Sequence, residues 1–496
     1  MKHLKAKTED QKRVEVMCMK LLHFGVTVLS FYLCWLLFRY HALFGMSKFA
    51  FRYNYYVAAG YAVCVFFFNR TYNAYLLGYT RIRTMVFAQF LSQFFSAGIM
   101  WLIVCLAWDH WQGPWIFFAL LAIQLLWDAA WSYSANGYYF KLYPPKKTIL
   151  IYRNAMDKKR FGSIKGKPSE RLYHIEEEFQ YDGYSFKAIR PKLEDYDAVF
   201  VAGVHSRCRN GIAKYCKEEG KVGFFLPHIG DVIMQEARHI QSFDSPVLFV
   251  TRSTLNPEYA LFKRAFDIVS SGAALIIFSP LMLITALAIH FYDGGPAIYK
   301  QVRLTQNGKE FKIYKFRSMR VDAEKDGVAR LSTGDKDDRI TPIGRIVRKC
   351  RLDELPQLWN IFKGDMSVVG PRPERPEIAE QYYEFLPDFR LRLQVKAGLT
   401  GYAQVYGKYN TDPYEKLEFD LLYINNMSVL TDIQLIFATF GILFSKDSTE
   451  GFEGEGGVTG AAAYRKETVT QATGIDYDNE ALREETAEEI AAQWAD

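Results

Sequence analysis

The stretch that decides the fold of the C-terminal half runs from residue 352 to residue 373 and reads LDELPQLWNIFKGDMSVVGPRP. Two adjacent carboxylates, Asp353 and Glu354, stand where the pattern predicts a helix to begin, and apolar residues then recur at helical spacing up to Gly364. We expect Asp353 to be the N-cap of this helix and Gly364 its C-cap. A carboxylate at the positive end of a helix dipole stays ionised, and the same end attracts phosphate. An isolated Asp-Glu pair is most simply a helix cap with a solvated neighbour, but the surroundings of this pair favour chemistry on phosphorus.

Cationic side chains gather around the pair. The segment 299–319 predicts two strands joined by a turn at Asn307-Gly308. Arg303 lies in the first strand, and Lys315 and Arg317 share one side of the second, where both can reach a common anion. Further arginines follow at positions 345, 348, 351, 372 and 375. Arginine forks suit diphosphate oxygens, and the prolines on both sides of Arg372 restrict its backbone.

Residues 263–445 resemble the bacterial polyprenyl-phosphate sugar-1-phosphate transferases, the enzymes that start lipid-linked glycan assembly. The resemblance rests on five stretches: KRAFD at 263–267, KFRSM at 315–319, LDELPQL at 352–358, KGDMSVVGPRP at 363–373 and GLTGYAQV at 398–405. Their order and spacing make a chance match improbable.

The resemblance implies a two-step reaction. Asp353 would be the nucleophile that attacks the sugar-linked phosphorus of a UDP-hexose, forming a covalent aspartyl sugar-phosphate and releasing uridine monophosphate (UMP). The sugar phosphate would then pass to undecaprenyl phosphate, which starts exopolysaccharide, capsule or O-antigen assembly. Glu354 would be the ligand of magnesium, and the substrate phosphates would be bound by Arg303, Lys315, Arg317, Arg372 and Arg375. No residue in the sequence decides between glucose, galactose and other hexoses.

The N-terminal third has the pattern of a membrane bundle, expected over residues 1–145. Four apolar runs lie at about 18–38, 53–69, 85–108 and 114–133, and the second has the shortest apolar core. Lysines and arginines precede the first run, lie between the second and third, and follow the fourth. This distribution predicts that both ends of the bundle lie in the cytoplasm, as in a multi-pass protein of the bacterial inner membrane.

A fifth apolar segment, 264–292, would place the catalytic residues outside the cell if it crossed the membrane completely. Nucleotide sugars are cytosolic, so an external site would have no donor. Pro280 removes a helix hydrogen bond near the middle of the segment. We therefore predict a re-entrant helix that breaks at Ser279-Pro280 and returns to the cytoplasmic face, as described for the family. The alternative is an ordinary span with a proline kink.

Residues 146–255 predict an α/β domain with buried strands at 148–152, 198–204, 222–226 and 247–250. Large members of the family carry a Rossmann-like domain here. The first strand is followed by RNAMDKK at 153–159 instead of a glycine-rich loop, so we expect no dinucleotide binding and a structural or homodimer-forming role. Residues 446–496 form an acidic tail with 13 Asp or Glu against 4 Lys or Arg.

The expected fold is therefore a membrane α-helical bundle, a Rossmann-like α/β domain and an α+β monotopic catalytic domain with a re-entrant membrane helix. The chain carries a net charge of +6, and its part before the acidic tail is more basic still, which suits anionic membrane lipids and phosphorylated substrates. Seven scattered cysteines indicate neither a disulfide framework nor a zinc site, and no nucleic-acid motif is present. Two other functions remain open: a membrane nucleotide-sugar dehydratase and a non-catalytic scaffold for glycan assembly.

Overall fold

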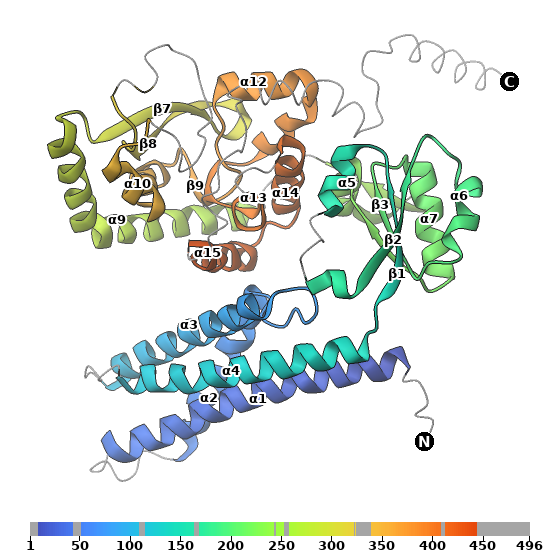
Figure 1. The fold of residues 1–496 in the computed structure, drawn as a ribbon. Coiled ribbons are helices and arrows are strands. Elements are labelled where there is room, and N and C mark those ends of the chain that lie inside the picture. The colour runs from blue at the N-terminus through green and yellow to red at the C-terminus, as the bar shows by residue number, and fades with distance from the viewer. Residues whose placement is uncertain are drawn as a thin grey trace. The chain divides into compact units, whose positions relative to one another are not determined.

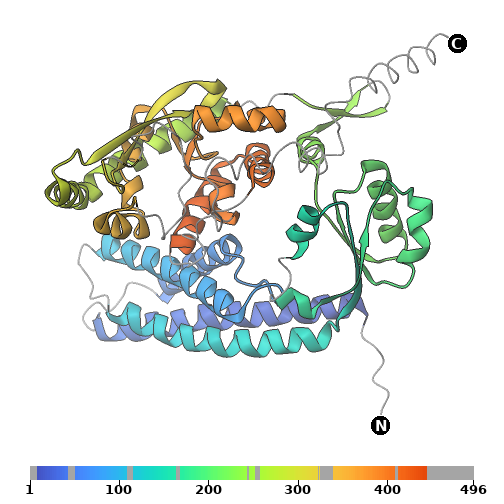
Figure 2. The same ribbon diagram turned by 45° about the horizontal axis from the view of Figure 1, so that its top comes forward.

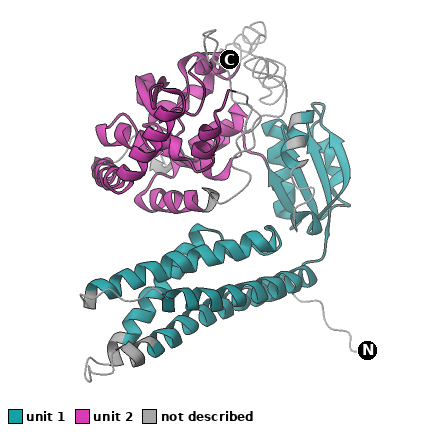
Figure 3. Ribbon diagram, turned by 60° about the vertical axis from the view of Figure 1, so that its left-hand side comes forward, with its two compact units in different colours: residues 1–225 teal, residues 226–496 magenta. Residues whose placement is uncertain are grey.

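The structure is a computed structural model that describes residues 8–42, 51–108, 115–162, 168–242, 245–251, 257–321, 323, 339–407 and 412–443. The chain divides into two compact units, residues 1–225 and 226–496 (Figure 3). The acidic tail expected at 446–496 lies outside the described residues.

The first unit begins with a bundle of long helices (Figure 1). They are α1 (Glu9–Ala42), α2 (Phe51–Thr71), α3 (Ile82–Trp108) and α4 (Trp115–Leu142). In the described part of the chain, four helices are long and apolar enough to cross a membrane, namely α1, α3, α4 and α9 of the second unit. Of the four runs expected to span in the bundle, the second, which forms α2, does not qualify, and it is the run with the shortest apolar core. These apolar helices mark the chain as a membrane protein.

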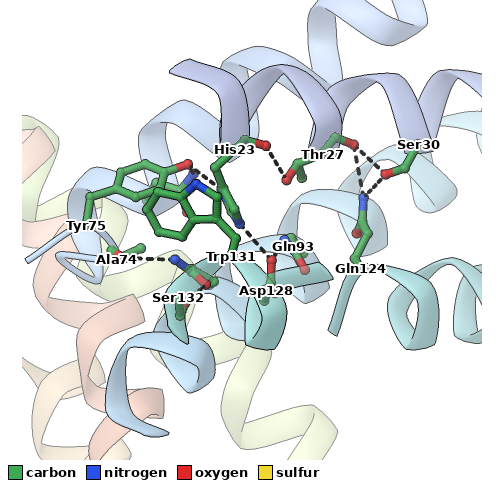
Figure 4. A network of polar contacts seen from close by, with 12 residues as sticks. His23, Thr27, Ser30, Ala74, Tyr75, Gln93, Gln124, Asp128, Trp131 and Ser132 are labelled. Carbon is green, nitrogen blue, oxygen red and sulfur yellow. Dashed lines mark hydrogen bonds and ion pairs between the residues drawn. The ribbon is translucent and has the colours of Figure 1, made fainter. Parts of the chain in front are cut away.

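Polar side chains are buried between the helices of the bundle. Figure 4 shows His23 of α1 between the Tyr75 hydroxyl, 2.9 Å from Nδ1, and the Asp128 carboxylate of α4, 2.9 Å from Nε2. Gln93 of α3 donates to the same Asp128 oxygen at 2.8 Å. Gln124 of α4 donates to the Thr27 carbonyl of α1 at 3.1 Å. Such contacts between helices favour a single packing arrangement, because each buried polar group needs its partner.

A parallel sheet follows the bundle. Its strands are β1 (Lys146–Tyr152), β2 (Tyr173–Gln180), β3 (Ala198–Ala202) and β4 (Val222–Phe225), in the spatial order β2-β1-β3-β4. Helices α6 (Phe186–Leu193) and α7 (Ser206–Glu218) cover one face, and α5 (Ala155–Gly162) lies on the other (Figures 1 and 2). Aromatic residues at the end of α4 also pack on the α5 side. The sheet is therefore enclosed on both faces, as parallel sheets generally are.

The structure corrects two expectations for residues 146–255. The strand β2 was not predicted, because it is an edge strand with only alternate residues partly buried and three glutamates in its middle. The strand predicted at 247–250 does not belong to the parallel sheet. It is β6 (Ser245–Phe249), which pairs antiparallel with β5 (Arg238–Ser242) in the second unit. Helix α8 (Ile229–Glu236) also packs in the core of the second unit, where Asn425 Nδ2 donates to the Val232 carbonyl at 2.7 Å.

The second unit is an α+β structure. After α8, β5 and β6 it contains α9 (Pro257–Asp293), β7 (Ile298–Leu304), β8 (Glu310–Phe316), α10 (Pro342–Lys349), the 3-10 turn η4 (Leu352–Glu354), α11 (Gln357–Lys363), β9 (Ser367–Val369), α12 (Pro376–Phe385), the 3-10 helix η5 (Pro387–Gln394), β10 (Gly398–Thr400), α13 (Tyr402–Tyr406), α14 (Pro413–Asn425) and α15 (Val429–Leu443). Its largest apolar core joins α8, α12, α14 and α15. A smaller core joins β8 to α11, and this second core sets the position of the residues around Asp353.

Helix α9 contains the predicted interruption at Ser279-Pro280, but the helix does not end there. It continues through Pro280, and Figure 1 shows it changing direction part-way along its length. Pro280 has no N–H to offer the Ile276 carbonyl one turn earlier, and the Ser279 hydroxyl donates to that carbonyl at 2.8 Å. The lost hydrogen bond is thus replaced locally, which is how proline is tolerated in apolar helices. The predicted break is a bend in a continuous helix.

Both ends of α9 are attached to the second unit. At the start, Lys263 Nζ lies 2.6 Å from Asp432 Oδ2, and Arg264 donates to the carbonyls of Ile361 and Phe362 at 2.8 Å. At the end, Asp293 pairs with Arg317. Between these anchors most of the apolar side chains are exposed. A helix with an exposed apolar surface and polar attachments at both ends is suited to lie in lipid while its ends remain packed on the second unit.

Candidate functional site

The hairpin of β7 and β8 presents the first cation of the site. The turn predicted at Asn307-Gly308 is confirmed, since both residues have positive φ, 61° and 73°, between the paired strands. Along β8, Phe311 and Ile313 are buried against α11, and Lys315 continues the same side of the strand. This alternation directs Lys315 toward Asp353 and Glu354.

Asp353 and Glu354 lie in the 3-10 turn η4 that precedes α11. The expectation that Asp353 caps α11 is wrong, because the helix begins at Gln357 with Pro356 as its N-cap and without a side-chain cap. The tighter turn at 352–354 separates the carboxylates from the helix start. The predicted C-cap is confirmed, as Gly364 is left-handed with φ 103° and its N–H bonds to the Asn360 carbonyl.

Glu354 is surrounded by positive charge. Its Oε1 accepts a hydrogen bond from Arg372 Nη2 at 2.9 Å, and Arg351 Nη1 lies 3.6 Å from the same oxygen. Arg351 reaches it from a left-handed backbone, φ 55°, which is unusual for a residue with a side chain. Burial by itself would raise the pKa of Glu354, but Arg372, Lys315 and Arg351 outweigh burial and lower it to about 2. Glu354 is therefore ionised throughout the physiological range.

The surroundings of Asp353 shift its pKa in the opposite direction to that of Glu354. Burial raises its pKa, the negative charge of Glu354 adds to this, and the value is about 6 in spite of Lys315 and Arg351. Its Oδ1 atom is buried and has no hydrogen-bond partner. A carboxylate oxygen that accepts no hydrogen bond is less stabilised than one held by donors, so the lone pairs of Asp353 Oδ1 remain available. Two adjacent carboxylates thus have pKa values moved apart by their surroundings, which is the usual sign of two different chemical roles.

The predicted phosphate-binding residues fall into two groups. The first group surrounds Lys315: the positive charges of Arg372 and Arg303 both act on its ammonium. The positive charges of Arg375 and Arg372 act in turn on the Arg303 guanidinium. Burial lowers the pKa of Arg303 to about 10, with Glu374 opposing the change. Arg317 is instead held by Asp293 at the end of α9, with one guanidinium nitrogen, Nη1, buried and without a partner. Lys315 and Arg317 therefore have different carboxylate neighbours, although we expected them to meet a common anion.

The loop that carries Arg372 depends on close backbone contacts. The short strands β9 and β10 pair in parallel, and beyond them Gly370 N–H bonds to the Thr400 carbonyl while Gly398 N–H bonds to the Pro371 carbonyl, both at 2.8 Å. A Cβ atom on Gly398 would lie 2.1 Å from the Gly370 nitrogen. The GLTG and VVGPRP motifs thus form one backbone junction, and Arg372 follows directly from it.

Sequence reasoning missed the residues that hold this loop from behind. Arg392 Nη2 donates to the Arg372 carbonyl at 2.7 Å, and the Arg392 guanidinium is bound by Asp420 through Nε at 2.8 Å. Both side chains are buried. Neither residue belongs to the motifs around Asp353, and the pair joins η5 to α14, so no local pattern in the sequence could reveal the contact.

Arg392→Lys is expected to lower kcat/KM by about tenfold to a hundredfold, because a lysine cannot bridge Asp420 and the Arg372 carbonyl together and the loop would move. Initial rates and the unfolding midpoint should be measured side by side. Arg390→Lys, at an exposed position two residues earlier, is the matched control. An unchanged rate in Arg392→Lys would exclude a positioning role for Arg392.

Burial, aided by the positive charge of Arg372, lowers the pKa of Lys315 to about 8. Lys315 is therefore protonated below about pH 8 and becomes neutral above it. If Lys315 binds phosphate as a cation, kcat/KM should fall about tenfold for each pH unit above that value. Lys315→Arg should keep the positive charge, so the fall of kcat/KM on the alkaline side of the pH profile should move to higher pH. An identical fall in the two proteins would exclude Lys315 as its cause.

The site can be compared with known proteins. Residues 258–446 match the sequence model of a family described as "Bacterial sugar transferase". The exopolysaccharide production protein PSS of Rhizobium leguminosarum bv. phaseoli is 43% identical over 188 residues, which are 36% of this chain and 93% of that protein. The chain belongs to the bacterial sugar transferase family. The expected family is thereby confirmed, and Asp353, Glu354 and all five predicted phosphate-binding residues lie within the matched region.

Longer proteins are also similar to part of this chain. One is the UDP-glucose:undecaprenyl-phosphate glucose-1-phosphate transferase of Klebsiella pneumoniae, 39% identical over 220 residues, 43% of this chain and 47% of that protein. Another is the UDP-N-acetylgalactosamine-undecaprenyl-phosphate N-acetylgalactosaminephosphotransferase of Aeromonas hydrophila, 41% identical over 187 residues, 37% of this chain and 44% of that protein. The matched region spans about half the length of these two curated relatives.

Proposed function

We propose that this sugar transferase moves a hexose-1-phosphate from a UDP-hexose to undecaprenyl phosphate and thereby starts the assembly of a lipid-linked polysaccharide. The observation that carries the proposal is the pair of neighbouring carboxylates with opposite pKa shifts, in which the buried Oδ1 of Asp353 has no hydrogen-bond partner and Glu354 is held by Arg372. The names of the relatives supply the class of donor and acceptor. They differ in the sugar, so the hexose is not assigned.

In the first step a carboxylate oxygen of Asp353 attacks the sugar-linked phosphorus of the donor. The bond from that phosphorus to the bridging oxygen breaks, and its electron pair leaves with UMP. In the second step a phosphate oxygen of undecaprenyl phosphate attacks the same phosphorus, and the Asp353 carboxylate is released. One nucleophile can thus serve a soluble donor and a lipid acceptor in turn.

The cations of the site would neutralise the phosphoryl oxygens. Arg372 and Lys315 lie beside the carboxylates, Arg303 and Arg375 extend the positive charge, and the free Nη1 of Arg317 offers another donor. Arginine forks and a lysine charge stabilise the negative charge that spreads over these oxygens during transfer.

Magnesium is compatible with the donor set. The described residues contain no group of three or more His, Cys, Asp or Glu that could form a metal cage. Magnesium needs none, because it commonly takes one or two carboxylates and completes its shell with water and substrate phosphates. Glu354, which is ionised throughout the physiological range, would hold it together with the substrate phosphates. When bound, the ion would add positive charge at the diphosphate.

We also propose that α9 is re-entrant and that the second unit lies on the cytoplasmic side of the inner membrane. Support comes from the attachments at both ends of the helix to one unit, Lys263 to Asp432 and Asp293 to Arg317. A straight crossing of about 30 Å of hydrocarbon would separate these ends by the whole membrane. The bend at Pro280 allows both ends to remain with the same unit, near cytosolic nucleotide sugars.

The proposal is tested by UMP release from a panel of radiolabelled UDP-sugars, in membranes that contain undecaprenyl phosphate and magnesium. If one UDP-sugar gives UMP release, and if continued release requires undecaprenyl phosphate, both the reaction and the donor are established. Wild-type membranes that release no UMP from any donor would favour the non-catalytic scaffold.

A further inference from the structure

The first unit contains an unexplained group of buried polar atoms at the carboxyl ends of β1 and β3. Three of these atoms have no hydrogen-bond partner: Arg153 Nη1, Asn154 Nδ2 and Asp157 Oδ2. Asp157 is only 3% exposed. Native proteins rarely leave buried polar atoms unpaired, and several in one place indicate a missing ligand or water.

The three residues converge on one point of the backbone. They lie in the turn after β1 and in the first turn of α5, where Asp157 N–H bonds to Asn154 Oδ1 at 2.8 Å. Opposite them is Gly203, directly after β3, with φ +67°. A Cβ atom on Gly203 would lie 2.0 Å from Asp157 Oδ2 and 3.1 Å from Arg153 Cβ. The unpartnered carboxyl oxygen therefore rests against the backbone of Gly203, just after β3.

This point is the switch point of the sheet. With the order β2-β1-β3-β4, the chain turns to one side after β1 and to the other after β3. Parallel α/β sheets bind ligands outside the carboxyl ends of their strands at such a point. Arg153 and Asn154 are only partly buried, so a ligand could approach from solvent. The turn lacks the glycines of a dinucleotide loop and supplies side-chain donors instead.

The chemistry of the group selects the ligand. Two N–H donors and the N-terminus of α5 favour an anion, and Arg160 adds positive charge near Asp157. The Asp157 carboxyl opposes an anion that has no proton to share. A phosphomonoester resolves this conflict, because its second pKa of about 6 is high enough for it to retain a proton beside a neighbouring carboxylate. Burial raises the pKa of Asp157 to about 6 as well, against Arg160 and Arg153, so one proton can be shared between the two groups.

We propose that this switch point binds a phosphomonoester, with Arg153 and Asn154 donating to its oxygens and a shared proton joining it to Asp157. The phosphoryl group could belong to a soluble phosphate such as a nucleoside monophosphate or to the headgroup of a polyprenyl phosphate. The site lies in the first unit, so it does not depend on the catalytic assignment of Asp353.

Hydrogen-deuterium exchange of the full chain in detergent micelles tests the proposal. Inorganic phosphate, UMP, a short polyprenyl phosphate and sulfate serve as probes at matched ionic strength. Phosphate is expected to protect the amides of residues 153–162 at a concentration about tenfold lower than sulfate, which has no proton to share. Protection by UMP would identify a soluble source, and protection by the polyprenyl phosphate alone a lipid source. No protection with any of the three phosphates would overturn the proposal.

Variants separate this site from the catalytic unit. Arg153→Gln should remove the protection, and Asp157→Asn should let sulfate protect as well as phosphate, because the opposing charge is gone. Lys214→Gln, an exposed lysine of α7, is the matched control and should behave like the wild type. If Arg153→Gln fails to fold, the proposal is still tested by comparing the protection that phosphate and sulfate give to Asp157→Asn. An unchanged preference for phosphate in that variant would exclude the shared proton.

Discussion

Asp353→Asn is expected to abolish UMP release, lowering kcat by at least about a thousandfold, as the removal of a nucleophile does in other covalent enzymes. Asparagine has nearly the same shape but no carboxylate oxygen that can bond to phosphorus. The protein should remain folded, because Asp353 Oδ1 makes no hydrogen bond that would be lost. Removing the Asp353 charge also relieves its repulsion of Glu354.

The measurement pairs radiolabelled UMP release with intact mass spectrometry in the absence of undecaprenyl phosphate. Wild-type protein incubated with the correct donor should gain the mass of one hexose phosphate, and Asp353→Asn should gain none. Asp388→Asn, on η5, removes another carboxylate from the same unit and is the matched control. Full activity in Asp353→Asn would exclude this residue as the nucleophile. Activity without any mass gain in wild type would instead favour direct transfer.

Arg372→Gln is expected to lower kcat/KM by about a hundredfold to a thousandfold, the range seen when one donor to a developing negative charge is removed. Arg372 holds Glu354 at 2.9 Å, so the substitution also leaves that carboxylate with fewer positive neighbours. The pKa of Glu354 should rise from its value of about 2, since Arg372 is the largest of the charges that lower it.

Arg372→Lys separates the two contributions. Lysine keeps the charge beside Glu354 but cannot form the two parallel hydrogen bonds of a guanidinium, so activity should recover only in part. Arg345→Gln removes an exposed arginine of α10 and should leave activity unchanged. Equal rates in Arg372→Gln and wild type would show that Arg372 contacts no group that changes charge during the reaction.

Much of the architecture could be predicted because its signals are local. Helices α1, α3, α4 and α9 are long apolar runs, the β7-β8 hairpin has Asn307-Gly308 at its turn, and Gly364 ends α11 in a left-handed conformation. Each of these features depends on a few consecutive residues. The motifs around Asp353 and Arg372 likewise identified the family, which the comparison with known proteins confirmed.

The incorrect expectations concern contacts between distant residues and small differences in local geometry. Aspartate is a common N-cap residue, so the sequence favours Asp353 as the cap of α11. In the structure, residues 352–354 form a 3-10 turn instead of the first turn of the α-helix, and the Asp353 carboxylate therefore lies before the helix. The edge strand β2 is too polar to predict from its pattern. The bond from Arg392 to the Arg372 carbonyl joins residues 20 positions apart, and its partner Asp420 lies 28 positions further on. Such contacts follow from packing, for which the sequence has no short pattern.

The junction of Gly370 with Gly398 has a consequence for engineering. Any side chain on Gly398 would meet backbone atoms of Gly370 at 2.1–2.6 Å, and backbone cannot move aside as a flexible side chain can. A directed-evolution library that seeks a new donor sugar therefore gains nothing from randomising these glycines, because most members would lose the loop that carries Arg372. Diversity is better placed on side chains that surround the phosphate cations, so that the recognition of the sugar can change while the geometry of phosphate transfer is inherited intact.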